Sequence, residues 1–192
     1  MGKPVTSHMR KITKKDVPLA IYDTRGFELG KEVQAEVKQE VMDTISKGLA
    51  TQDINKAIHC IWYCINTASN RIEPEEIEWL RELSMENQIT QIPIIVVLTQ
   101  SFSKKKAQEM RQVLLKENLD IIQIIPVLAE DYEIEDLGVA KAHGLDMLIT
   151  VMGEALPDEL IDTLQHVQIA CLEEKKRRAQ AAVATASVAA TG

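Results

Sequence analysis

The sequence lacks the features that mark membrane-spanning, secreted and zinc-binding proteins. Its 192 residues contain no apolar run long enough to cross a bilayer and no signal peptide. The three cysteines, Cys60, Cys64 and Cys171, have no matching Cys or His pairs at metal-ligand spacing. We interpret them as buried thiols in a reducing compartment rather than as disulfides or zinc ligands, and we expect a cytoplasmic protein.

Basic residues are also in the minority. With 22 Lys and Arg against 29 Asp and Glu, the net charge is −7. This balance argues against nucleic-acid binding as the main function, so no nucleic-acid partner is expected. The hydrophobic fraction of 45% is ordinary for a soluble globular chain, and the length fits one domain with an appendage.

The chain alternates short apolar runs with amphipathic stretches. Segment 9–13 is predicted to form an edge strand hairpinned onto strand 17–22, and further strands are predicted at 57–65, 92–98 and 121–128. Helices are expected to begin near Gly30, at Pro74, after Ser103 and after Gly144. This order predicts an α/β fold in three layers, with a mainly parallel sheet and helices on both faces. The residues expected to face inward from the helices are Val33, Val37, Val41, Ile45, Leu49, Ile77, Leu80, Leu83, Ala107, Met110, Val113, Leu114, Leu145, Leu148, Met152 and Leu156.

Pro157 separates this core from a C-terminal region. Residues 158–178 read as an amphipathic helix ending in four basic residues, and an alanine-rich tail runs on to Gly192. In a longer parent protein the basic cluster would favour the anionic inner face of a membrane. The alternatives are a protein partner and a helix packed only on its own domain.

The stretch from Val17 to Gly26 is the clearest candidate for ligand chemistry. Its apolar strand ends in Asp23-Thr24-Arg25-Gly26. Because open α/β sheets bind ligands at the carboxyl ends of strands, Asp23 could hold Mg²⁺ or its water there, and Gly26 would let a backbone N–H approach a phosphate. The alternative is a turn that ends the strand without any chemistry.

Three motif positions, in order along the chain, resemble those of an Era-type small GTPase domain of the P-loop class. Asp23-Thr24-Arg25-Gly26 matches the Asp-x-x-Gly motif, Thr99-Gln100-Ser101-Phe102 lies where Asn/Thr-Lys-x-Asp follows a strand, and Val127-Leu128-Ala129 lies where the Ser-Ala loop follows the next strand. The similar proteins form a bacterial family whose GTPase domain precedes an alanine-rich, helical, membrane-associated region. The resemblance implies a GTPase-like domain over 1–156 and the start of a truncated helical region over 157–192.

The resemblance also implies a set of site residues. In a GTP-hydrolysing parent protein, Thr6 would ligate Mg²⁺ directly, Asp23 would hold it through water, and the Gly26 N–H would sense the γ-phosphate of GTP. Thr99 and Ala129 would contact the nucleotide from the two later loops. The cofactors implied for the parent are therefore GTP and Mg²⁺, and no residue of this chain is assigned a catalytic role.

The chain departs from the family at the positions that matter most for nucleotide binding. No Gly-x-x-x-x-Gly-Lys-Ser/Thr loop occurs, Phe102 stands where a carboxylate selects guanine, and Phe27 stands where many GTPases have glutamine. We expect an incomplete domain, without the first strand and the phosphate loop, that binds nucleotide poorly on its own. The alternative is a GTPase-like interaction scaffold without nucleotide chemistry.

In the related domains the missing strand lies between the strands that correspond to 17–22 and 57–65. Either these two strands pair directly, or a strand from a second chain fills the slot, because buried backbone polar groups need hydrogen-bond partners. Of the two, we favour the second, which predicts a homodimer.

Overall fold

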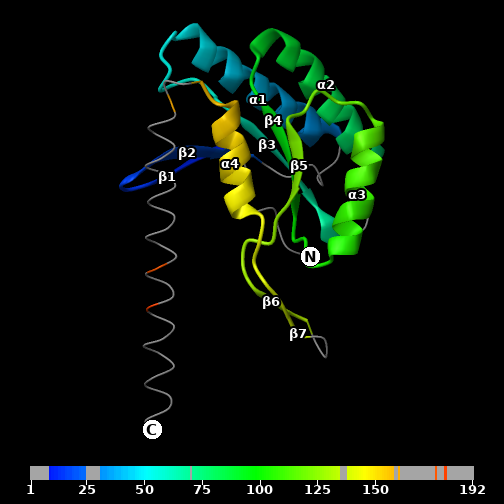
Figure 1. Cartoon of the computed structure of the whole chain (residues 1–192). Helices are drawn as coiled ribbons and strands as arrows, with labels where there is room; N and C mark the ends of the chain where they lie inside the picture. Colours follow the sequence, from blue (N-terminus) through cyan, green and yellow to red (C-terminus); the bar gives the residue numbers. More distant parts are fainter. Residues whose placement is uncertain are drawn as a thin grey trace. The chain divides into compact units, whose positions relative to one another are not determined.

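A computed structural model describes residues 9–24, 31–69, 71–134 and 138–157, together with 160, 176 and 180 (Figure 1). The chain divides into two compact units. The first unit comprises Met1–Val41 and Pro157–Gly192, and the second comprises Met42–Leu156. The described part of the first unit comprises a hairpin and the beginning of a helix, whereas the second unit holds the parallel sheet.

The hairpin of the first unit is formed by β1 (Arg10–Lys14) and β2 (Val17–Asp23), as the sequence predicts. The strands are antiparallel and pair Ile12 with Ile21 and Arg10 with Asp23. Lys11 lies over the ring of Tyr22, with its Nζ 5.5 Å from the ring centroid. Neither strand has a buried residue, so cross-strand side-chain pairs define this hairpin.

Helix α1 (Lys31–Ala50) follows, and only some residues of its apolar stripe are buried. Val37 and Ile45 are buried, but Leu49 is 45% exposed, so the prediction that it faces inward is wrong. Residues four apart advance by slightly more than one helical turn, and the stripe therefore rotates away from the buried side along the helix. Gly48, in the last turn of the helix, is buried, and a Cβ there would lie 2.9 Å from the carbonyl oxygen of Lys56.

The sheet of the second unit has three parallel strands in the order β3-β4-β5. They are β3 (Ile61–Asn66), β4 (Ile94–Thr99) and β5 (Gln123–Pro126). The five residues from Ile94 to Leu98 are all buried, which accounts for the uninterrupted apolar run of the central strand. The predicted strands at 57–65 and 121–128 are each longer than the observed ones. Residues 57–60 are not in a strand, and Ile122 is 53% exposed.

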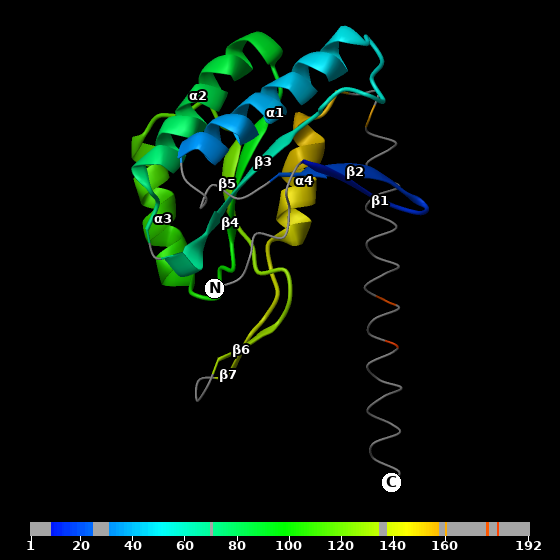
Figure 2. The ribbon, with the colours of Figure 1, turned by 180° about the vertical axis from the view of Figure 1, so that it is seen from behind.

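Helices cover both faces of this sheet, as Figures 1 and 2 show from opposite sides. Helix α2 (Pro74–Thr90) and helix α3 (Lys104–Lys116) lie on one side, and α4 (Leu145–Ala155) lies on the other. Two right-handed crossovers that proceed in the same direction across a sheet place both of their helices on one face. The predicted α/β class and the placement of helices on both faces are confirmed for this unit.

Several inward-facing predictions hold and others fail. Leu80, Leu83, Ala107, Met110, Leu114, Leu148 and Met152 are buried. Val113 and Leu145 were expected inside but are 44% and 40% exposed. The buried stripes of α3 and α4 are narrower than the apolar pattern. In addition, Trp79 and Val151 are buried without having been expected.

The stretch after β5, for which the sequence predicts no strand, contains a second hairpin. Its strands are β6 (Tyr132–Ile134) and β7 (Gly138–Ala140), which pair in antiparallel fashion. Figure 1 shows this hairpin extending away from the end of the sheet. The sequence pattern did not indicate this hairpin.

The strand pairings test whether segments 17–22 and 57–65 lie next to each other in one sheet. Among the described strands, β2 pairs with β1 and β3 pairs with β4, and the two pairs belong to separate sheets. Direct pairing of 17–22 with 57–65 is thus not found, while pairing with a second chain stays a prediction. The helix predicted at 158–178 lies almost wholly outside the described residues. Of the helices that the structure describes, none has the length and apolarity needed to span a membrane.

Three helices of the chain end in the same way. The residues Gln52, Gln91 and Asn118, just beyond α1, α2 and α3, have φ values of 51°, 53° and 49°. This left-handed conformation commonly follows a helix, where glycine is the usual residue. Here amide side chains occupy all three positions.

Candidate functional site

The candidate site lies at the carboxyl edge of the parallel sheet, which is the end where β3, β4 and β5 finish. The chain continues there as a short 3-10 helix, Thr67–Ser69, after β3, as loop 99–103 after β4, and as segment 127–129 after β5. Because the three strands are parallel, their carboxyl ends meet at one edge. The two later segments hold the motif positions that the sequence analysis assigned to nucleotide contacts.

Two threonine hydroxyl groups join the first two segments. The Thr67 hydroxyl donates to the carbonyl oxygen of Gln100 at 2.8 Å, and Thr67 is only 2% exposed. The Thr99 hydroxyl donates to the carbonyl oxygen of Ile65 at 3.3 Å. Both contacts run from one strand end to the next, and they hold loop 99–103 against the end of β3.

Ser101 connects the same loop to the third segment. Its backbone N–H donates to the carbonyl oxygen of Val127 at 3.1 Å. Its hydroxyl donates to the carbonyl oxygen of Leu98 at 2.8 Å, and the residue is 1% exposed. A buried hydroxyl without a partner would be costly, so these two bonds fix the conformation of the loop. Gln100, with a φ of 52°, makes the sharp turn before Ser101.

An aromatic pair connects this loop to the second hairpin. The ring of Phe102 stacks on that of Tyr132 at the base of the β6–β7 hairpin, with centroids 5.2 Å apart and an interplanar angle of 17°. Asp131 accepts hydrogen bonds from the Ala142 N–H and the Lys141 ammonium, both at 2.8 Å. The bond from Lys141, helped by that from Ala142, holds the pKa of Asp131 below its ordinary value of 3.8. The carboxylate therefore closes the hairpin at its base.

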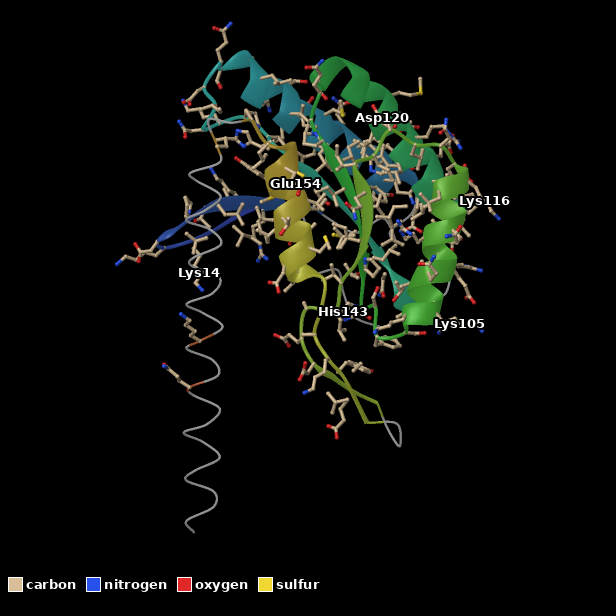
Figure 3. All side chains as sticks on the ribbon, viewed as in Figure 1. Lys14, Lys105, Lys116, Asp120, His143 and Glu154 are labelled. Atoms are coloured by element: carbon tan, nitrogen blue, oxygen red, sulfur yellow. The ribbon has the colours of Figure 1, made fainter. Side chains whose placement is uncertain are left out.

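A glycine brings helix α4 close to the end of β5. Gly144 has a φ of 89°, and a Cβ on it would overlap the Pro126 carbonyl oxygen and lie 3.0 Å from Val127 Cα. Next to it, His143 and Leu128 exchange two backbone hydrogen bonds of 2.9 Å. The His143 side chain is exposed, and its Nδ1 lies 3.1 Å from the Lys141 carbonyl oxygen (Figure 3). The His143 side chain therefore belongs to the surface.

The lysines that begin α3 belong to the solvated surface. Lys105 has a side chain that is 88% exposed, and its Nζ lies 3.9 Å from Glu109 Oε1 on the same helix. Figure 3 shows Lys105 at the first turn of α3. An exposed pair of this kind contributes little to stability and does not itself indicate an anion site.

The predicted site residues fall into different parts of the chain. Thr99 and Ala129 both lie at the carboxyl edge, where Thr99 is half-buried and Ala129 is exposed. Asp23 belongs to the first unit, where its carboxylate lies 3.6 Å from the Arg10 guanidinium across the hairpin. Thr6 and Gly26 lie outside the described residues, as does Phe27.

Sequence reasoning missed Thr67, Ser101 and Tyr132. A hydroxyl residue directly after an apolar strand is a weak signal for Thr67 and Ser101, whereas nothing near Tyr132 in the sequence indicates its contact with Phe102. Thr67 and Ser101 are buried and bonded within the edge, whereas Tyr132 is 51% exposed beside it. Among the described residues there is no group of three or more His, Cys, Asp or Glu side chains arranged to hold a metal ion.

Comparison with known proteins adds no relative to this picture. No protein-family model matches the chain, and no curated protein matches it significantly.

Proposed function

We propose that the second unit carries the base-binding edge of a small-GTPase-like domain, and that the chain takes part in binding a guanine nucleotide with Mg²⁺. The supporting observation is the hydrogen bond from Ser101 to Val127, which joins the loops after β4 and β5 at the carboxyl edge of a parallel sheet. Open α/β sheets bind ligands at this edge. The two joined segments are those that resemble the base-contacting motifs of Era-type GTPases.

In this proposal the phosphate groups and the metal would be bound elsewhere. Thr6 and Asp23 would hold Mg²⁺, which neutralises phosphate charge, and the Gly26 N–H would approach the γ-phosphate. Asp23 suits this role, because its side chain is 45% exposed and its ion pair with Arg10 is the weak, solvated kind that a cation can replace. The main phosphate cradle would have to come from a segment other than these 192 residues, since no such loop is present in them.

The expected affinity is accordingly low. Without the phosphate loop, GDP should bind this chain no more tightly than roughly millimolar, a free energy of about −4 kcal/mol. Binding is best followed by ¹⁵N NMR, with GDP added to the full chain in the presence of Mg²⁺. The amides of 99–103 and 127–130 should shift, while those of the exposed end of α3 near Lys116 (Figure 3) should not.

A pair of variants tests the assignment of the base-binding loop. Phe102→Asp introduces a carboxylate that can accept two hydrogen bonds from guanine, each worth about 1.5–3 kcal/mol. The ratio of GDP to ADP affinity should rise at least tenfold in Phe102→Asp. Phe102→Leu, which removes the ring without adding a carboxylate, serves as the matched control and should leave the ratio unchanged.

Two results would contradict the proposal. If GDP shifts no amide at the carboxyl edge even at tens of millimolar, the edge binds no nucleotide and the scaffold alternative stands. A submicromolar, Mg²⁺-dependent dissociation constant would show instead that phosphate is bound by groups that the proposal leaves out.

A further inference from the structure

The β6–β7 hairpin adds an aromatic surface to the carboxyl edge of the sheet. Tyr132 is the first residue of β6, and its ring stacks on Phe102 from the loop after β4. Although one side of its ring faces Phe102, Tyr132 remains 51% exposed. A further planar group can therefore lie against the pair.

Both rings are carried by segments that are fixed in place. Phe102 follows Ser101, which is buried and bonded to Leu98 and Val127. Tyr132 follows Asp131, which is bonded to Lys141 and Ala142 across the base of the hairpin. Because neither segment must become ordered when a ligand arrives, little conformational entropy is lost on binding.

The chemistry around the pair favours stacking over edge recognition. Loop 99–103 contains no carboxylate. The Asp131 carboxylate, next to Tyr132, already accepts two hydrogen bonds. Aromatic faces bind every nucleobase, because each base has a π-face, whereas telling guanine from adenine requires hydrogen bonds to the edge of the base.

We propose that Phe102 and Tyr132 form a stacking platform for a nucleobase, and that the platform accepts adenine and guanine alike. The inference rests on the proposed function and deepens it by naming the specificity. It makes Tyr132, contributed by a hairpin absent from the sequence prediction, a binding residue of the base site.

The test measures the binding of GMP and AMP to the full chain by NMR titration, with ribose 5-phosphate as the probe that lacks a base. The two nucleotides should have dissociation constants within about threefold of each other, and ribose 5-phosphate should not shift the Phe102 or Tyr132 amides. Tyr132→Leu removes the ring and keeps apolar bulk. This variant should weaken both nucleotides by about fivefold to a hundredfold, the range observed when a stacked aromatic is removed.

Val139→Ala is the matched control. Val139 lies on the same hairpin and is also 51% exposed, but it pairs with Glu133 and so lies on the opposite face from Tyr132. The Val139→Ala chain should bind like the unaltered protein. A preference of more than tenfold for GMP over AMP would overturn this inference and leave the proposed function standing. The same holds if Tyr132→Leu binds both nucleotides as tightly as the unaltered protein. The absence of any shift with either nucleotide would overturn both.

Discussion

Replacing Gly144 with alanine probes the contact that joins β5 to helix α4. The glycine has a φ of 89°, where an L-residue is strained, and an added Cβ would overlap the carbonyl oxygen of Pro126. The neighbouring backbone cannot yield easily, because His143 and Leu128 are held together by two hydrogen bonds of 2.9 Å. To relieve the overlap, α4 must move away from the end of β5.

The loss of stability expected in Gly144→Ala has two parts. The left-handed conformation costs an alanine about 1–2 kcal/mol. Moving the helix strains or breaks the two backbone bonds, each worth about 0.5–1.5 kcal/mol. The free energy of unfolding should therefore fall by about 2–5 kcal/mol, which for a unit of this size lowers Tm by roughly 8–20 °C.

Urea unfolding followed by tryptophan fluorescence measures this loss, since Trp62 and Trp79 are the two tryptophans of the chain and both lie in the second unit. Gly138→Ala is the control. Gly138 has a similar φ of 96°, but a Cβ there would meet nothing within 4 Å. Gly138→Ala should therefore lose only the stability that the left-handed conformation costs an alanine. If the two variants lose the same stability within about 0.5 kcal/mol, the overlap with Pro126 does not restrain the helix and the reasoning fails.

Other predictions concern the core, the thiols and association. Leu80→Ala, at a side chain that is 0% exposed, should cost about 2–5 kcal/mol in urea unfolding, whereas Leu115→Ala, at 51% exposed, should cost less than about 1 kcal/mol; equal losses would contradict the assigned core. Cys64 is exposed in β3, so the interpretation of this thiol as buried is wrong. Burial raises the pKa of Cys60 from 9.0 to about 12, so a thiol reagent should modify Cys64 before Cys60. The unfolded chain loses the Cys60 proton near pH 9, whereas the folded chain keeps it until about pH 12, so the free energy of unfolding should decline as pH rises from 9 towards 12. If the free energy of unfolding of the wild type does not decline over this range relative to that of Cys60→Ala, the prediction is wrong. In a longer parent protein, changing residues 175–178 to glutamine should reduce co-sedimentation with anionic vesicles at least tenfold, given about 1 kcal/mol per basic residue. Unaltered sedimentation would remove the membrane interpretation. Light scattering over a range of protein concentrations should reveal a dimer, and a constant monomer mass would exclude one.

Local signals in the sequence are enough to predict helix α3. The sequence predicts a helix that begins after Ser103, and the Ser103 hydroxyl caps it by accepting a hydrogen bond from the Lys106 N–H at 3.4 Å. The apolar spacing likewise predicts the burial of Ala107, Met110 and Leu114. Caps and helical periodicity act within a few residues of the chain, and they can therefore be recognised without tertiary structure.

The parts that could not be predicted depend on contacts between distant segments. Strands β6 and β7 have three residues each, too few to give an alternating pattern, and their base is closed by the pair Asp131 and Lys141. The stack of Phe102 on Tyr132 joins two segments that separate strands bring together. The candidate edge of the sheet could be located from strand order, but the groups that shape it could not.

The left-handed residues after α1, α2 and α3 bear on how the protein could change. An L-residue in this conformation costs about 1–2 kcal/mol, somewhat less for asparagine, and glycine largely avoids the cost. Gln52, Gln91 and Asn118 thus leave three separate positions at which a single substitution can add stability without touching the core or the carboxyl edge of the sheet. A chain with such reserves lies below its own stability maximum. If one of these residues is first replaced by glycine, the added stability can offset a destabilising substitution at the carboxyl edge. Changes of binding specificity at that edge would then be tolerated.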